Sequence, residues 1–412
     1  MSPRTRILLF DWLSGGHHSV YLRRFSETLS AHFDVAVAAP DTTVEELADL
    51  GLECFALGER RPTAVNAQSG TWALRSATAK EVELLTHAAE RLHADHVVHM
   101  YADAALPRLA TRRRLPTPVT IVLFYPRAHY PAVYQTHLPP AERIRAWGKE
   151  GLLRAWRRRS DANAVLTLDE EAVRRWIRTR GAPAFWLPEP PLGVLPELDQ
   201  GRLLLRSGCI LYGSLAERKG IDLLSRAVSL SPTSLHVTLA GPAGPEFLPR
   251  VEGYVSEMRR SGATVDLRAR RHSELDGLRA LAGSRCAVLP YPRHDGMSRV
   301  LLEAASVGTP VVVHDRGLLG HLVLRYRLGL AVDCRNPRAL RRAIFNLTEA
   351  TRAEEYADSL ARFSALFSPD CFERALLAPF NGTPSSTSGA PRRFGRPGLR
   401  RPRSASMTGD SR

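Results

Sequence analysis

The hydrophobic and polar positions of the chain alternate between short apolar runs and longer segments with helical periodicity. In the first half, the apolar runs that we expect to form buried strands lie at residues 6–10, 33–39, 95–100 and 118–124. Between the second and third of these, residues 77–92 place their apolar side chains on one face of a helix. Strands that alternate with helices in this way predict a parallel, doubly wound α/β sheet.

The same alternation returns in the second half, after a segment that suits neither a helix nor a central strand. Residues 187–196 contain four prolines and one glycine, which is typical of a linker between domains. We expect two Rossmann-like domains that face a cleft. The expected boundaries are a first domain at 1–188, a hinge at 189–207, a second domain at 208–368, a helix at 369–380 that returns to the first domain, and a disordered basic tail at 381–412.

Composition sets broad limits on the class of protein. A chain of 412 residues with 44% hydrophobic residues is long enough for two cores. It has no run of eighteen apolar residues, so we expect no transmembrane helix and a cytoplasmic protein. The five cysteines are scattered without metal-ligand spacing, which indicates reduced thiols and no zinc site.

The net charge of +15 is compatible with several anionic partners. Nucleoside diphosphates, lipid phosphates, an anionic membrane face and nucleic acid would each suit a basic protein, so charge alone does not choose between them. Only three of the 57 basic residues are lysines, Lys80, Lys149 and Lys219. A lysine within a motif is therefore informative in this chain.

Residues 289–312 carry the strongest candidate chemistry. The pattern predicts a strand end, a loop, a helix that Ser298 caps, a stop at Gly308 and a further strand. Asp295 in the loop and Glu303 in the helix lie eight residues apart, around a helix N-terminus that attracts anions. A carboxylate there can accept hydrogen bonds from a ribose, so this is a layout for a sugar nucleotide. An ordinary βα unit with surface acids explains the same pattern about equally well.

Two glycine-containing turns follow other predicted strands. Gly15 and Gly16 follow the first strand, and Gly213 follows the strand at 209–212. Such glycines let a backbone approach a phosphate, although a simple strand-to-helix turn also uses them. Arg218 and Lys219 stand just after the second turn, where a cation can meet a diphosphate.

The stretch from Asp295 to Glu303, followed by Ala-Ala-Ser-Val-Gly-Thr-Pro-Val-Val, resembles the acid-x7-Glu signature of the retaining glycosyltransferases of GT-B fold known as family 4, or group 1. The segment Gly213 to Gly220 is similar to that family's Gly-Arg-x4-Lys-Gly motif. In two places the chain departs from the family: the first acid is Asp295 rather than Glu, and Ser214 occupies the place of the arginine.

The resemblance implies a role for each matching residue. Lys219, with Arg218 in place of the missing arginine, would bind the pyrophosphate, Glu303 the ribose, and Asp295 the donor sugar. The loop residues and the cap, Gly296, Met297 and Ser298, together with Gly213, would complete the donor site. In the first domain, on the acceptor side, the resemblance places Gly15 and Gly16 under the diphosphate, and His129 stands near the strand end where relatives carry a histidine. His129 is equally compatible with a structural role.

A basic segment at 143–159 carries Ile144, Trp147, Leu152, Leu153 and Trp156 at helical spacing. It suits either a helix packed on the core with a solvated arginine face, which we favour, or peripheral contact with an anionic membrane.

The function expected from these features is metal-independent, retaining transfer of a sugar from a nucleoside diphosphate sugar to a hydroxyl of a glycan, a lipid or a small molecule. No cofactor or metal is expected, and no nucleic acid as a partner. Two alternatives stay open: a sugar-nucleotide epimerase that uses the same donor site, and a non-catalytic protein that binds a sugar nucleotide or an anionic polymer.

Overall fold

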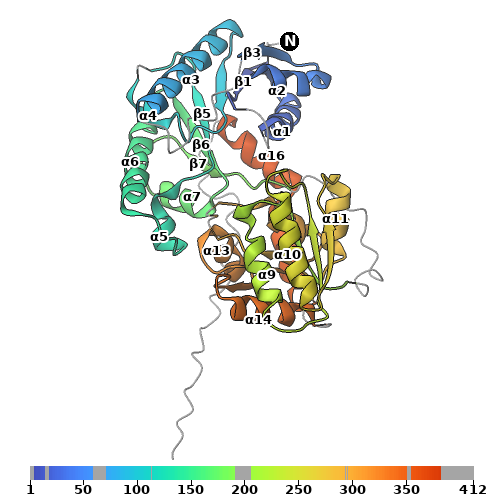
Figure 1. Cartoon of the computed structure of the whole chain (residues 1–412). Helices are drawn as coiled ribbons and strands as arrows, with labels where there is room; N and C mark the ends of the chain where they lie inside the picture. The colour runs from blue at the N-terminus through green and yellow to red at the C-terminus, as the bar shows by residue number, and fades with distance from the viewer. Residues whose placement is uncertain are drawn as a thin grey trace, which may run out of the picture.

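The chain folds into two α/β domains, each built on a parallel sheet (Figure 1). The computed structural model describes residues 4–13, 18–58, 71–112, 114–190, 206–292, 294, 296–349 and 354–381. The predicted tail, most of the predicted hinge, and Gly15, Gly16 and Asp295 lie outside these residues.

The N-terminal domain contains a seven-stranded parallel sheet with the order β3-β2-β1-β4-β5-β6-β7. Its strands are β1 (Arg6–Phe10), β2 (Asp34–Ala39), β3 (Glu53–Ala56), β4 (His96–His99), β5 (Val119–Leu123), β6 (Ala162–Thr167) and β7 (Ala184–Trp186). The described helices are α1 (His18–Ser30), α2 (Asp41–Glu46), η1 (Ala48–Leu50), α3 (Thr71–Arg91), α4 (Leu106–Thr111), η2 (Arg127–His129), α5 (Tyr130–Val133), α6 (Pro140–Trp156) and α7 (Glu170–Trp176).

Strand β1 is apolar from Ile7 to Phe10 because both faces of the sheet are covered there. Leu8 and Phe10 pack with α3, α4 and α6 on one face of the sheet. Ile7 and Leu9 pack with α1 on the other face. Alternate side chains of a strand point to opposite faces, so a strand covered on both sides needs a continuous apolar run. This confirms the doubly wound arrangement predicted from the sequence.

The C-terminal domain repeats this arrangement with a six-stranded parallel sheet in the order β10-β9-β8-β11-β12-β13. Its strands are β8 (Cys209–Tyr212), β9 (His236–Ala240), β10 (Thr264–Arg268), β11 (Cys286–Leu289), β12 (Val311–His314) and β13 (Gly329–Val332). The described helices are η3 (Glu217–Lys219), α9 (Ile221–Val228), α10 (Leu248–Arg260), α11 (Glu274–Ala282), α12 (Arg299–Ser306), α13 (Gly317–Tyr326), α14 (Pro337–Thr348), η4 (Glu354–Tyr356), α15 (Ala357–Leu366), α16 (Pro369–Leu377) and η5 (Ala378–Phe380).

The last helices carry the chain back to the N-terminal domain (Figure 1). The ring of Phe372 in α16 lies edge-on to Phe25 in α1, with 5.5 Å between their centroids. Leu376 is fully buried in the same cluster. The two domains are therefore joined twice, by the segment after β7 and by α16.

Several elements of the N-terminal domain were not predicted. β3 is an edge strand whose residues are half-buried or exposed, and the apolar run within it, Cys54 to Ala56, is only three residues long. β7 has only three residues, and α4 and α7 have six and seven. Elements this short contain less than two full periods of a helical pattern, which is why periodicity does not detect them. Within the described residues, no helix has the length and apolar character that crossing a bilayer would require.

Candidate functional site

The candidate site lies where the carboxyl ends of the C-terminal strands face the N-terminal domain. Gly213 follows β8, and the loop at 290–298 follows β11 and leads into α12. The two domains approach each other closely at this loop, because a Cβ atom on Gly296 would lie 3.1 Å from Cε1 of Tyr125, just after β5. Ligands of open parallel sheets bind at such strand ends.

The turn after β8 brings Lys219 under the strand end. Gly213 has φ of +104°, and a Cβ atom on it would lie 3.4 Å from Nζ of Lys219. Gly220 has φ of +68° and reverses the chain between η3 and α9. Both positive φ values favour glycine, so the two glycines fix the backbone around the lysine.

The Lys219 ammonium is buried, with 7% of the residue exposed. Its Nζ donates a hydrogen bond to Oη of Tyr291 at 2.8 Å and lies 4.2 Å from the centroid of that ring. Burial, together with the smaller effect of the neighbouring Arg218 charge, lowers the pKa of Lys219 to about 7, while Glu303 opposes both effects. Because desolvation destabilises the charged form, an anion bound here would be stabilised by a cation that is poorly hydrated.

Helix α12 begins at the predicted place, but its cap differs from the prediction. Ser298 is the N-cap residue with extended backbone angles, yet its side chain makes no capping hydrogen bond. The Ser298 hydroxyl interacts with Tyr291 instead, which is also the partner of Lys219. The first-turn N–H groups of α12 are therefore not satisfied by this side chain, which leaves a helix N-terminus suited to an anion.

Glu303 lies one turn further along α12 and is 9% exposed. Burial raises the pKa of Glu303 to about 7; Arg299 and Lys219 act to lower it, and Glu274 and Glu189 to raise it. Glu303 and Lys219 thus influence each other across the site. The structure brings together Gly213, Arg218, Lys219, Ser298 and Glu303, all of which the sequence singled out.

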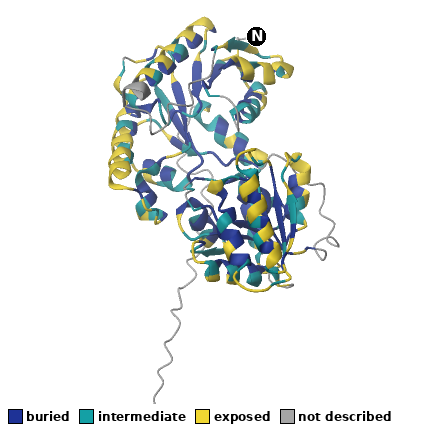
Figure 2. Ribbon diagram, in the orientation of Figure 1, coloured by how far each residue is buried: buried dark blue, intermediate teal, exposed yellow. Residues whose placement is uncertain are grey.

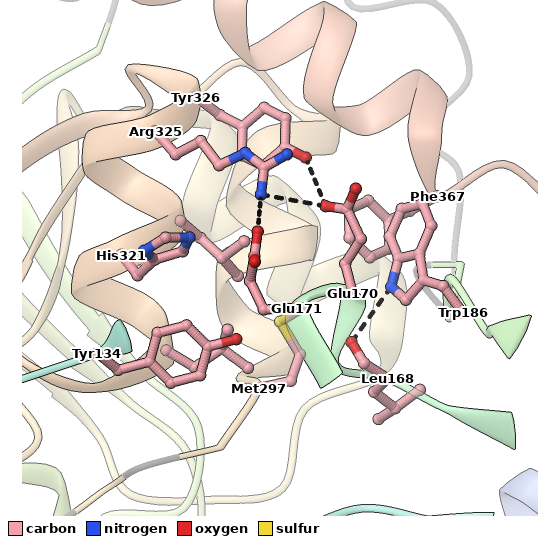
Figure 3. A pocket seen from close by; sticks show the side chains of 12 residues that line it. Tyr134, Leu168, Glu170, Glu171, Trp186, Met297, His321, Arg325, Tyr326 and Phe367 are labelled. Carbon is pink, nitrogen blue, oxygen red and sulfur yellow. Dashed lines mark hydrogen bonds and ion pairs between the residues drawn. The ribbon is translucent and has the colours of Figure 1, made fainter. Parts of the chain in front are cut away.

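Met297 connects the loop at 290–298 to both domains. Its side chain packs against the apolar cluster of β11, β12 and α12, and also against the cluster that contains α1 and β5. It also lines a cavity between α7 and α13 (Figure 3). There, Nη1 of Arg325 lies 2.6 Å from Oε1 of Glu171, and Tyr326 Oη donates to Glu170 Oε2 at 3.1 Å. These bonds fasten the two domains together beside the site.

His129 does not open toward the site in this structure. It is 3% exposed, and its Nε2 lies 3.1 Å from Oδ2 of Asp169. Tyr134 Oη donates to the other carboxylate oxygen of Asp169 at 2.6 Å. These contacts favour the structural role that the sequence also allowed for His129.

The N-terminal side of the cleft contains a buried pair that the sequence did not indicate. Asp11, just after β1, is 1% exposed, and its Oδ2 lies 2.8 Å from Nδ1 of His18 at the start of α1. Burial raises the pKa of Asp11, and its bonds to His18 oppose this effect. The His18 ring packs against Tyr101, after β4, with centroids 4.0 Å apart and the two planes tilted by 43°.

A second unpredicted group spans the hinge. Tyr21 in α1 donates a hydrogen bond to Glu189, which is 5% exposed and lies two residues before the undescribed part of the linker. Nη2 of Arg299, the first residue of α12, lies 4.0 Å from Oε1 of Glu189. A linker glutamate therefore connects the N-terminal domain to the helix that carries Glu303.

Within the described part of the chain, one group of side chains has the geometry of a metal site. His314, Asp315 and Asp333 place their ligand atoms within 4.8 Å of one another, at the ends of β12 and β13. His314 is already engaged, since its Nδ1 lies 3.3 Å from Oδ1 of Asp315 and 3.9 Å from Oδ1 of Asp333.

Comparisons with known proteins agree with this architecture. Residues 206–350 match the family model described as Glycosyl transferases group 1, which covers most of the C-terminal domain. No curated protein sequence matches the chain. Sucrose-phosphate synthase from Thermosynechococcus elongatus superimposes with a TM-score of 0.62 at 18% identity, over 90% of this chain and 96% of that one.

Two further solved structures show the same likeness. WaaG, a glycosyltransferase involved in lipopolysaccharide biosynthesis, gives a TM-score of 0.58 at 15% identity, over 92% of this chain and 100% of that one. HepE from Anabaena, in complex with UDP and glucose, gives a TM-score of 0.59 at 16% identity, over 91% of this chain and 98% of that one. The fold is GT-B. The GT-B fold places the site described above in the cleft between its two domains.

Proposed function

We propose that this protein is a retaining glycosyltransferase that moves a sugar from a nucleoside diphosphate sugar to an acceptor hydroxyl without a metal. The observation that carries the proposal is the meeting of the buried Lys219, the N-terminus of α12 and the buried Glu303 at one edge of the C-terminal sheet. This domain also contains the match to the group 1 family model.

Each group has a role in holding the donor. The Lys219 ammonium and the first N–H groups of α12 bind the diphosphate, because both present positive charge in a poorly hydrated place. Glu303 accepts hydrogen bonds from the ribose hydroxyls. Asp295 orients the transferred sugar, a role that comes from the family resemblance. Arg218, exposed beside Lys219, supplies the cation that Ser214 does not.

In the reaction, the bond between the anomeric carbon and the diphosphate oxygen breaks, and the electron pair stays with the diphosphate. The acceptor hydroxyl attacks the face from which the diphosphate departs, and its proton passes to an oxygen of that leaving group. Negative charge grows on the diphosphate as the bond lengthens. Lys219 and the α12 amides stabilise that charge, which lowers the barrier.

The test is turnover with UDP-, GDP- and ADP-sugars, with UDP-sugars first because HepE, a structural neighbour, was solved with UDP and glucose. We expect release of one nucleoside diphosphate in the presence of EDTA, accelerated by an acceptor, with a product whose anomeric configuration by NMR equals that of the donor. An epimerase would instead change the sugar without releasing nucleoside diphosphate. A non-catalytic binding protein would bind the donor and leave it intact.

A further inference from the structure

Helix α6 (Pro140–Trp156) exposes two large apolar side chains. Ile144 is 67% and Trp147 57% exposed, and their separation of three residues places them on the same face. Figure 2 shows exposed residues along most of this helix, at the outer edge of the N-terminal domain. From the sequence, we favour a helix packed on the core. That holds only for its last turn, where Leu153 and Trp156 are buried.

The surroundings of this apolar pair are basic. The exposed cationic residues on α6 and just after it are Arg143, Arg145, Lys149, Arg154 and Arg158. The guanidinium of Arg143 lies 5.4 Å from the centroid of the Trp147 ring. The acids of the helix are already engaged: Glu142 lies 3.6 Å from Arg127, and Glu150 accepts hydrogen bonds from Arg154 and Trp176. The exposed face therefore combines apolar area with net positive charge.

The helix is held firmly at its C-terminal end. Trp156 is 1% exposed in the core, and the buried Arg157 donates to the carbonyl oxygens of Ala182 and Trp176. Trp176 Nε1 donates in turn to Glu150 at 3.1 Å. The apolar pair is therefore presented by an anchored helix.

We propose that the α6 face, defined as Ile144, Trp147 and the adjacent basic residues, docks on the surface of an anionic lipid bilayer. A bilayer offers negative headgroups for the arginines and an apolar layer beneath them for the tryptophan and the isoleucine, as an interfacial helix requires. A second copy of the chain would bring two positive faces together. A nucleic acid would pair with the arginines and stack on Trp147, but would leave Ile144 without an apolar partner.

The α6 face lies close to the candidate site, so docking on a bilayer would bear on the proposed sugar transfer. Arg127, which contacts Glu142 of α6, also lies 5.7 Å from the ring centroid of Tyr125. Tyr125 in turn meets Gly296 at the mouth of the candidate site. Since a helix rises about 1.5 Å per residue, Trp147 lies roughly 8 Å along α6 from Glu142. Docking would bring the cleft close to the bilayer, and, if the proposed function holds, the acceptor is a membrane-embedded amphiphile with a sugar or hydroxyl headgroup.

The experiment is co-sedimentation of the full chain with phosphatidylcholine vesicles, with or without one third phosphatidylglycerol. The Ile144→Ser/Trp147→Ser double variant leaves the net charge unchanged, so general attraction of a basic protein to the vesicles is the same as in wild type. We expect it to partition about tenfold more weakly onto the anionic vesicles. Arg143→Gln and Arg145→Gln should each weaken partitioning by roughly fivefold. The control Leu230→Ser removes an exposed leucine from the C-terminal domain and should change nothing.

Two results would overturn the proposal. Equal partitioning of wild type and the Ile144→Ser/Trp147→Ser variant would show that charge alone, including that of the tail, drives the interaction. Tighter binding to duplex or single-stranded DNA than to the anionic vesicles would assign the basic face to nucleic acid. Calorimetric UDP binding by the same variant is measured in parallel, so that failure of docking is distinguished from failure of the donor site.

Discussion

The two domains share one architecture but build their sides of the cleft in different ways. In the C-terminal domain, the candidate groups come from two short segments, 213–220 and 296–303, each placed directly after a strand. In the N-terminal domain, the groups that face the cleft come from separate elements: Asp11 after β1, His18 in α1, Tyr101 after β4 and Tyr125 after β5. The family model covers the first arrangement and not the second.

The two arrangements differ in how much of each side of the cleft a local sequence motif can encode. A diphosphate and a ribose need a helix N-terminus, a cation and a carboxylate, and a single βα unit can present these groups in a contiguous motif. If the proposed function holds, the groups at the N-terminal strand ends receive the acceptor, and no single motif contains them. We therefore expect changes in the C-terminal segments to abolish donor chemistry, and changes in the N-terminal groups to leave donor binding intact.

The largest effect is expected from Lys219→Met, which keeps the length of the side chain but removes its charge. Loss of one preorganised donor to a developing anion typically costs ~100- to 1,000-fold in kcat. The measurement is the rate of nucleoside diphosphate release at saturating donor. Lys219→Arg is the matched control, and a methionine variant with wild-type kcat would remove Lys219 from the mechanism.

Glu303→Gln should weaken nucleotide binding by roughly 10- to 100-fold, because charge-assisted hydrogen bonds to the ribose become neutral ones. Calorimetry with UDP and with its 2′-deoxy analogue checks the assignment. Wild type should prefer UDP, and the variant should show a clearly smaller preference. A preference of undiminished size would mean that Glu303 does not contact the ribose.

Donor binding should be strongest near pH 7. Lys219 must be protonated to bind the diphosphate, and its pKa in the free protein is lowered to about 7, so affinity falls as the pH rises above that value. Glu303 must be ionised to accept from the ribose, and its pKa is raised to about 7, so affinity also falls below it. On the acid limb and on the alkaline limb of the pH profile, the Kd should rise by up to about tenfold per pH unit. Lys219→Met should flatten the alkaline limb and move the acid limb to higher pH, because the Lys219 charge lowers the pKa of Glu303.

The smallest of these effects is expected from His18→Asn on the N-terminal side. We expect the KM for the acceptor to rise several-fold, because the residue that packs against Tyr101 and pairs with Asp11 is shortened. The Kd for UDP should stay the same. A matching loss of UDP affinity would contradict the expectation that changes in the N-terminal groups leave donor binding intact.

The parts of this protein that could be predicted from the sequence are those governed by local pattern. β1, β5, β8 and β11 are apolar because both faces are buried, and Gly213 and Gly220 stand where positive φ is required. The edge strand β3 contains only a three-residue apolar run, and its residues are half-buried or exposed, so its sequence gives a weaker signal. Ser298 shows the limit within one motif: its place at the helix start was predictable, but its choice of Tyr291 over a backbone N–H depends on a residue brought in by β11.

Local sequence patterns do not predict contacts between distant segments. The burial of Asp11 against His18 and of His129 against Asp169 depends on how the strand ends meet. Glu189 was assigned only to a proline-rich linker, yet the fold places it between Tyr21 and Arg299. The exposure of Ile144 and Trp147 could not be distinguished from burial, because helical spacing shows a face and not what covers it.

The central claim is that the C-terminal segments form a metal-independent site for a nucleoside diphosphate. Calorimetric titration of UDP, GDP and ADP, with and without Mg2+, into wild type and Glu303→Ala tests it most directly. We predict that one nucleotide binds wild type equally well with and without the metal, and that Glu303→Ala loses this binding. Absence of binding by all three nucleotides, or binding that requires Mg2+ or survives in Glu303→Ala, would contradict the claim.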